Sequence, residues 1–404
     1  MKITCVICEY NPFHNGHEYM LRQLRENGST HIAAIMSGNF TQRGEAAIYD
    51  KFTRTRAALT GGADLVIELP VSFACANAQR FAYGGVYLAE SLGCTEELAF
   101  GSESGNTELL TKAASAIDDE RVRKDIGERM SSGITFAAAR EQAVEKIFGK
   151  NVSQLLHSPN DILGIEYIRA LNIAGSRISP VSVKRIGAAH DSSDTENNIT
   201  SAKNIREMLY SGNNDGYSYI PDAAAGLFRS AENKPPYGGR KNELEKAMIY
   251  RLRTMTKEQL AALPEISEGL ENRLYDSIRK SVSVEEIADS TKSKRYTRAR
   301  INRILTYALL GFEKSSLSES PQYVRILGMN SRGKEILRAA KKTAKLPVVM
   351  KYSDLEYGTK AHKMFMQESM CDDIYALSGK DNDICGRNFT GKMIIQDLIK
   401  DTLE

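Results

Sequence analysis

Short apolar runs alternate with helix-like patterns through the first half of the chain. The runs are bounded by turn residues, and the segments between them show apolar residues at spacings of three and four. This alternation is typical of a parallel sheet whose strands are joined by helices. We therefore predict an α/β fold with a doubly wound, parallel, Rossmann-like sheet, and expect strands at residues 3–8, 30–36, 64–69, 98–100 and 178–184.

The pattern changes beyond Gly212, where helical spacing dominates. The sequence predicts a loop at 234–239, a short apolar run at 346–350 and a helix at 359–370. Because 404 residues exceed the size at which one core usually keeps growing, we expect a catalytic domain at 1–210 and a mainly helical region at 211–404 with a small C-terminal segment. The other helices are expected at 242–252, 256–263, 269–282, 284–288 and within 291–305.

Cysteine usage and the N-terminal residues favour a cytoplasmic protein. Cys5 and Cys8 lie in one predicted strand, where they would point to opposite faces. Cys371 and Cys385 are too far apart to complete a zinc site with such a pair. We expect reduced cysteines and no metal site. The sequence shows no signal peptide and no apolar run of membrane-spanning length, so we expect no membrane partner, and it indicates no protein partner.

The strongest chemical signal lies just after the first predicted strand. The strand breaks at Pro12, and His14 and His17 follow on either side of Asn15-Gly16. At the start of the next helix, the unpaired backbone N–H groups and the helix dipole favour an anion. Two imidazoles there could stabilise the charge that builds on a phosphoryl group under attack, and a glycine allows close approach. The pattern predicts a triphosphate site.

Other predicted strand ends carry polar loops that would meet at the same edge of the sheet. The loop after the second strand contains Gly38, Asn39 and Gln42, which we predict to bind a small anionic or carbonyl-bearing substrate. Thr200 and Ser201 open a later helix, with Arg206 behind them. Such a helix start can hold the β- and γ-phosphates as pyrophosphate leaves, although the pair could also be a simple helix cap.

The net charge of +3 says little about nucleic acid, but basic residues cluster at 291–305. The helical pattern there places apolar residues on one side and basic residues beside an aromatic ring on the other. This face would suit a phosphate backbone and an unstacked base, although a solvated surface helix has the same composition. The predicted RNA contacts are Lys294, Arg295, Tyr296, Arg298, Arg300 and Arg303.

These motifs together resemble the nucleotidylyltransferases that carry a HIGH-type motif. Residues 9–17, Gly38-Asn39-Phe40, the 64–70 strand, 160–164 and 294–298 are similar to the bacterial tRNA(Met) cytidine acetate ligases over nearly the full length. The resemblance implies ATP-dependent activation of acetate as acetyl-adenylate, followed by acetylation of the wobble cytidine of elongator tRNA(Met) to N4-acetylcytidine. Mg²⁺ is expected to accompany the triphosphate.

The resemblance also implies a set of ATP contacts. The phosphate motifs add catalytic roles for His14, His17 and Arg206. They also predict phosphate contacts for Thr200 and Ser201. The contacts implied by the resemblance are Ile7, Cys8, Glu9, Tyr10, Asn11, Pro12, Phe13, His14, Asn15, Gly16, His17, Glu18, Tyr19, Met20, Gly101, Asn160 and Arg185.

Two other functions fit parts of the sequence. An adenylyltransferase for a small phosphorylated metabolite would share the first half, but it has no need for a long basic helical extension. A non-catalytic RNA-binding protein would need only the second half, and it would leave His14, Gly16, His17 and Arg206 unexplained.

Overall fold

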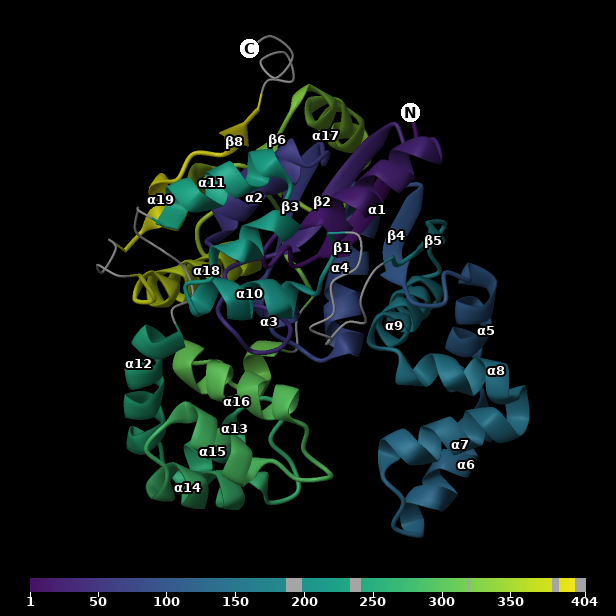
Figure 1. The fold of residues 1–404 in the computed structure, drawn as a ribbon, viewed down its shortest axis with the longest axis vertical. Helices are drawn as coiled ribbons and strands as arrows, with labels where there is room; N and C mark the ends of the chain where they lie inside the picture. Colours follow the sequence, from purple (N-terminus) through teal and green to yellow (C-terminus); the bar gives the residue numbers. More distant parts are fainter. Residues whose placement is uncertain (187–197, 233–240, 318–319, 380–384, 397–404) are drawn as a thin grey trace.

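The computed structural model describes residues 1–186, 198–232, 241–317, 320–379 and 385–396, and its centre is one mostly parallel sheet (Figure 1). The predicted loop at 234–239 lies outside the described residues. All five predicted strands are confirmed. The strand order is β5-β4-β1-β2-β3-β6-β7. The predicted strands have the bounds β1 Ile3–Cys8, β2 His31–Ser37, β3 Leu65–Leu69, β4 Glu97–Ser102 and β5 Ser179–Lys184.

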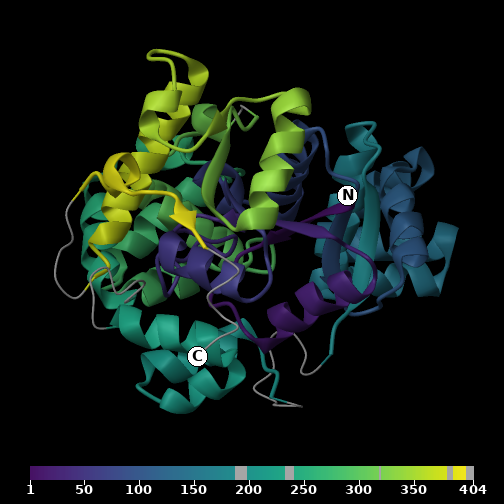
Figure 2. The ribbon, with the colours of Figure 1, turned by 90° about the horizontal axis from the view of Figure 1, so that it is seen from above.

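Alternating side chains of the strands build two cores, one on each face of the sheet. Ile3, Cys5 and Ile7 pack with one group of helices, whereas Val6 packs with the other. Cys8 contacts the second core, so the two N-terminal cysteines do point to opposite faces, and both are free thiols. Figure 2 shows α1 and α17 on opposite sides of the sheet.

The helices divide between these two faces. One face is covered by α1 Asn15–Glu26, α2 Lys51–Thr60, α10 Ala202–Tyr210 and α11 Asp222–Glu232. The other is covered by α4 Ala78–Leu92, α5 Thr107–Asp118, α9 Pro159–Ile173 and α17 Ser331–Thr343. Short α3 Val71–Ala74 follows β3, and the segment between α5 and α9 forms α6 Glu120–Ser131, α7 Phe136–Phe148 and α8 Lys150–Ser153.

The sheet crosses the predicted domain boundary at residue 210. Strand β6 (Val324–Met329) pairs antiparallel with β3, and it is flanked by β7 (Val348–Val349) and β8 (Ile394–Ile395). All six residues of β6 are buried. No local sequence pattern predicts β6, and a boundary at 210 would separate it from the sheet that it extends.

Five helices of the second half form a helical lobe that lies beside the carboxyl ends of the parallel strands (Figure 1). Its core includes Leu252, Leu274, Ile301 and Leu305. The lobe confirms the predicted helices of this region. Its members are α12 Lys241–Thr254, α13 Lys257–Ala262, α14 Leu270–Lys280, α15 Val284–Thr291 and α16 Arg298–Leu310.

The last described segments return to the sheet, with α18 Lys360–Ala376 and α19 Arg387–Thr390 beyond β7 in the sequence. The predicted helix at 359–370 is thus confirmed and is longer than expected. Among the helices that the structure describes, none combines the length and the hydropathy needed to cross a membrane.

Candidate active site

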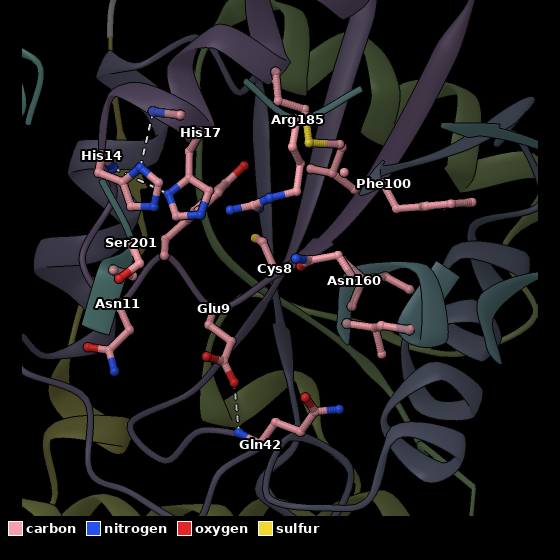
Figure 3. Close-up of a pocket in the computed structure, with 18 of the residues that line it drawn as sticks. Cys8, Glu9, Asn11, His14, His17, Gln42, Phe100, Asn160, Arg185 and Ser201 are labelled. Atoms are coloured by element: carbon pink, nitrogen blue, oxygen red, sulfur yellow. Dashed lines mark hydrogen bonds between the residues drawn. The ribbon is translucent and has the colours of Figure 1, made fainter. Parts of the chain in front are cut away.

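The two histidines lie where β1 ends and α1 begins (Figure 3). His14 is the N-cap of α1, and its Nδ1 accepts a hydrogen bond from the Gly16 backbone N–H at 3.1 Å. His17 Nδ1 accepts from the His14 backbone N–H at 3.3 Å. A Cβ at Gly16 would lie 2.9 Å from the His14 ring, so this close contact requires glycine. The short motif therefore fixes both rings through its own backbone.

Both imidazoles are held in the neutral form. Burial, with the nearby Arg185 and Arg206 cations, lowers the pKa of His14 to about 3. Burial, His14 and Arg185 lower the pKa of His17 well below its usual value. Because each Nδ1 accepts a backbone hydrogen bond, the proton of each neutral ring is on Nε2. The site thus offers two neutral N–H donors to an oxygen that develops charge.

The low pKa of His14 predicts a dependence of stability on pH. Above the unfolded-state pKa near 6.5 both states are neutral at this residue, whereas between that pH and about 3 only the unfolded state binds a proton. The free energy of unfolding should therefore fall as the pH falls through this window, by up to about 1.4 kcal/mol per pH unit. Urea unfolding of the protein and of His14→Asn, which keeps a helix cap, should show a shallower fall in the variant; equal slopes would contradict the prediction.

Two aromatic rings support His17. The Tyr10 ring centroid lies 4.8 Å from that of His17 and 4.9 Å from that of Phe13, both in edge contacts. Tyr10 has a φ of +48°, which is uncommon for a residue with a side chain. Phe13 is fully buried and does not reach the cavity. Tyr10 and Phe13 therefore orient a histidine, and of the two only Tyr10 can touch a ligand.

A cavity of about 220 Å³ opens beside the histidines at the carboxyl edge of the sheet. Of the predicted ATP, catalytic and substrate residues, those that do not line it are Pro12, Phe13, Asn15, Glu18, Gly38, Asn39 and Thr200. The predicted residues that do are Ile7, Cys8, Glu9, Tyr10, Asn11, His14, Gly16, His17, Tyr19, Met20, Gln42, Gly101, Asn160, Arg185, Ser201 and Arg206.

One wall of this cavity is apolar, and most of its residues were not predicted from the sequence. Phe81, Phe100 and Tyr167 come from α4, β4 and α9, and all three are buried. Phe100 and Tyr167 pack with their ring centroids 5.6 Å apart. In the sequence, these aromatic residues cannot be distinguished from ordinary core residues. Only the topology of the sheet and helices shows that they border a cavity.

The second predicted phosphate motif meets the first. Ser201 is the N-cap of α10, where its hydroxyl accepts from the Asn204 N–H at 3.1 Å. Arg206, one turn further, donates to the Asn11 carbonyl at 2.7 Å. Thr200 accepts from the Asn204 side chain at 3.0 Å and is turned away from the cavity. Thr200 therefore does not line the cavity, whereas Ser201 and Arg206 do.

Arg185 and Asn160 face the histidines from the other side of the cavity (Figure 3). The Arg185 guanidinium forms no hydrogen bond or ion pair with any residue that the structure describes. Asn160 donates its side-chain amide to Glu103 at 2.6 Å, which leaves its carbonyl oxygen for a ligand. The cavity therefore combines a cation, an amide carbonyl and two imidazole donors.

The predicted substrate loop places one of its three candidates in the cavity. Gln42 lines it, and its Nε2 is buried without a partner within the described chain. Asn39 instead donates to Asp372 at 2.8 Å and accepts from the Lys51 N–H, while the Gly38 carbonyl accepts from Arg54. Gly38 and Asn39 therefore do not line the cavity, and both join the loop to the core.

Two buried cations of α2 lie next to this loop. Lys51 is fully buried and forms ion pairs of 2.6 Å with both Glu68 and Asp372. Arg54, also fully buried, donates to the carbonyls of Glu9 and Ser37. Arg54 thus holds the ends of β1 and β2 together, and Lys51 joins α2 to β3 and α18.

The basic segment differs from the predicted helical face. Helix α16 begins only at Arg298, after Thr297 caps it. Tyr296 is buried, and Arg303 is buried in an ion pair with Glu265 at 2.7 Å. The exposed face that was to contain Tyr296 and Arg303 is therefore wrong. Of the other predicted RNA contacts, Lys294 and Arg295 are exposed, and Arg298 and Arg300 are half-buried.

Comparisons with known proteins agree with this geometry. The model of the family described as HIGH Nucleotidyl Transferase matches residues 1–387. The tRNA(Met) cytidine acetate ligase of Thermoanaerobacter sp. (strain X514) is 41% identical over 401 residues, which cover 98% of this chain and 100% of that protein. The enzyme of the same name from Acetivibrio thermocellus is 36% identical, with coverage of 98% and 100%.

Two solved structures are similar over the same extent. The crystal structure of Thermotoga maritima TmcAL in its apo form has a TM-score of 0.92, and that of TmcAL bound with alpha-thio ATP has a TM-score of 0.90. In both cases the identity is 31%, and the match covers 98% of this chain and 100% of the other.

Proposed function

Because this chain belongs to the HIGH nucleotidyl transferase family, and within it to the tRNA(Met) cytidine acetate ligases, we propose that it forms acetyl-adenylate from ATP and acetate and acetylates the wobble cytidine of elongator tRNA(Met). The observation that carries the proposal is the pair of neutral imidazoles in the cavity, each with its remaining N–H at Nε2. The likeness to a crystal structure bound with alpha-thio ATP supports an ATP site.

In the first step an acetate oxygen attacks the α-phosphate of ATP, and pyrophosphate leaves. His14 and His17 would donate hydrogen bonds to the phosphate oxygens as charge develops on them. Ser201 and Arg206, at the start of α10, would hold the departing phosphates. The Arg206 bond to the Asn11 carbonyl links this group to the histidine motif.

The opposite wall of the cavity suits the nucleoside. The apolar side chains of Phe100, Leu163 and Tyr167 lie beside Asn160. An adenine ring would be buried against them, and its exocyclic amine would donate to the free carbonyl oxygen of Asn160. We assign Arg185 to the phosphate side because its guanidinium acts on the electrostatics of both histidines.

Gln42 is our proposed contact for acetate. Its buried amide nitrogen needs an acceptor, and the acetate oxygens are acceptors of suitable size for this position. Mg²⁺ would accompany the triphosphate. In the described part of the chain, no group of three or more His, Cys, Asp or Glu side chains could bind a metal ion, so we propose that phosphate oxygens and water hold it.

The helical lobe is our proposed tRNA-binding region, through its exposed basic residues. We expect Lys294→Ala combined with Arg295→Ala to weaken tRNA binding about tenfold at low salt and to reduce the slope of log affinity against log salt by about one to two, because each residue neutralises a phosphate. Filter binding over a salt series would measure both effects, and acetyl-adenylate formation should stay unchanged.

A matched control removes two exposed lysines elsewhere. Lys341 and Lys342 lie in the last turn of α17, on the sheet and away from the helical lobe (Figure 1). If their alanine variants weakened binding as much as the lobe variants do, general charge and not the lobe would account for the affinity.

The direct test of the function uses ATP, radiolabelled acetate and bacterial tRNA. Digestion of the tRNA should yield labelled N4-acetylcytidine. Acetyl-adenylate without labelled RNA would keep the ATP site and exclude the proposed acceptor. Absence of both products would favour an adenylyltransferase with another substrate, or an RNA-binding protein without this activity.

A further inference from the structure

Acetyl transfer to cytidine requires a group that takes a proton from the exocyclic amine. The lone pair of this nitrogen is delocalised into the ring, so the amine must lose a proton as it bonds to the acetyl carbon. Neither histidine can accept that proton as it lies, because each Nδ1 already accepts a backbone N–H and each Nε2 carries the hydrogen. The base must come from another side chain of the cavity.

Two carboxylates line the described cavity, Glu9 and Glu45. Glu9 directly follows β1, and one of its oxygens accepts the Gln42 backbone N–H at 2.8 Å. Its second oxygen forms no hydrogen bond or ion pair with a described residue. Figure 3 shows Glu9 between the two histidines and Gln42. The carboxylate is therefore held in place at one oxygen and available at the other.

Glu45 is less suited to the same task. Its side chain is 42% exposed and forms an ion pair with Arg206, with 3.7 Å between Oε2 and Nη2. A carboxylate in that position would screen the cation that we assign to the departing phosphates. Glu9 instead adjoins Gln42, whose amide nitrogen is our proposed contact for the acetyl oxygen, so Glu9 lies beside the carbon that the amine attacks.

We propose that Glu9 is the general base of acetyl transfer. This inference rests on the proposed function. The cytidine N4 forms a bond to the acetyl carbon, the bond from that carbon to the phosphate oxygen breaks, and AMP leaves with the electron pair. The N4 proton passes to the free oxygen of Glu9 and from there to water. The resemblance places Glu9 within a segment that contacts ATP; the geometry assigns its side chain to the second step.

Glu9→Gln is the sharpest test, because glutamine keeps the oxygen that accepts the Gln42 N–H and removes the base. Acetate-dependent exchange of labelled pyrophosphate into ATP should stay within about threefold of the original rate. Transfer to tRNA, measured in a single turnover, should fall about a hundredfold or more, as is typical for loss of a general base.

Hydroxylamine and two further variants distinguish loss of the base from loss of acetyl-adenylate formation. Hydroxylamine, which needs no base from the enzyme, should trap acetyl-adenylate equally in both proteins. Glu9→Asp, with a shorter carboxylate, should recover about tenfold over Glu9→Gln. Glu26→Gln changes a glutamate at the C-terminal end of α1. It is the matched control and should change neither step.

The inference is overturned if exchange and transfer fall together in Glu9→Gln, or if transfer persists. The proposed function fails separately, if the unaltered protein shows no acetate-dependent exchange or no acetylated tRNA.

Discussion

Replacing His17 with alanine is expected to lower the rate of acetyl-adenylate formation about a hundredfold or more. The change removes one of two N–H donors in the cavity, and it also frees the His14 backbone N–H that His17 Nδ1 now accepts. ATP affinity should change much less, because the neutral ring interacts with charge that is largest in the transition state. Acetate-dependent pyrophosphate exchange at saturating ATP would measure the effect.

His157→Ala is a control for this variant. His157 is exposed, and its Nε2 contacts Glu141 at 2.9 Å and not the cavity. Its loss should leave the exchange rate within about twofold of the original, since an exposed pair of this kind contributes little. Near-normal exchange in His17→Ala would remove the histidines from the proposed mechanism.

Arg303→Ala is expected to lower the free energy of unfolding by about 3–5 kcal/mol. Arg303 pairs with Glu265 through two bonds of 2.8 and 2.7 Å, and both side chains are nearly buried. Removal of the cation would leave a buried, unpaired carboxylate. Equilibrium unfolding in urea would measure the loss, and activity should fall with stability because Arg303 also donates to the Gln42 carbonyl at 3.4 Å.

Two further variants distinguish a role of Arg303 in stability from a role in RNA binding. Adding Glu265→Gln to the variant Arg303→Met should restore most of the stability, because neither buried charge remains. Arg295→Ala, whose exposed ion pair with Glu268 is worth about 0–1 kcal/mol, should unfold almost as the original does. If Arg303→Ala were fully stable and failed only to bind tRNA, the structural role would be wrong.

Most of the sheet could be predicted because its strands are short apolar runs between helical patterns. Strand β6 escaped prediction for a physical reason: it carries a charged residue, Arg325, at its second position, is antiparallel to its neighbour β3 and lies far from it in sequence. Its burial on both faces depends on elements that no local pattern identifies.

The residues of the candidate site also divide into those that local patterns predict and those that depend on contacts distant in the sequence. The histidine motif, Ser201 and Arg206 could be predicted, because local spacing fixes a helix start and the topology brings strand ends together. Asn39 and Arg303 could not, because their partners Asp372 and Glu265 lie far away in the sequence and change an exposed polar residue into a buried one. A sequence shows which residues carry charge, but the fold decides which of them meet solvent.

The antiparallel pairing of β3 with β6 also affects how the protein is made. Strand β3 is fully buried in the finished sheet, and its outer edge is covered only by Val324–Met329. When only the first half of the chain has been synthesised, the outer edge of β3 is therefore uncovered. An apolar edge strand of this kind is prone to pair with other chains. A premature stop before β6 would leave this edge of β3 uncovered, and we expect such a fragment to aggregate.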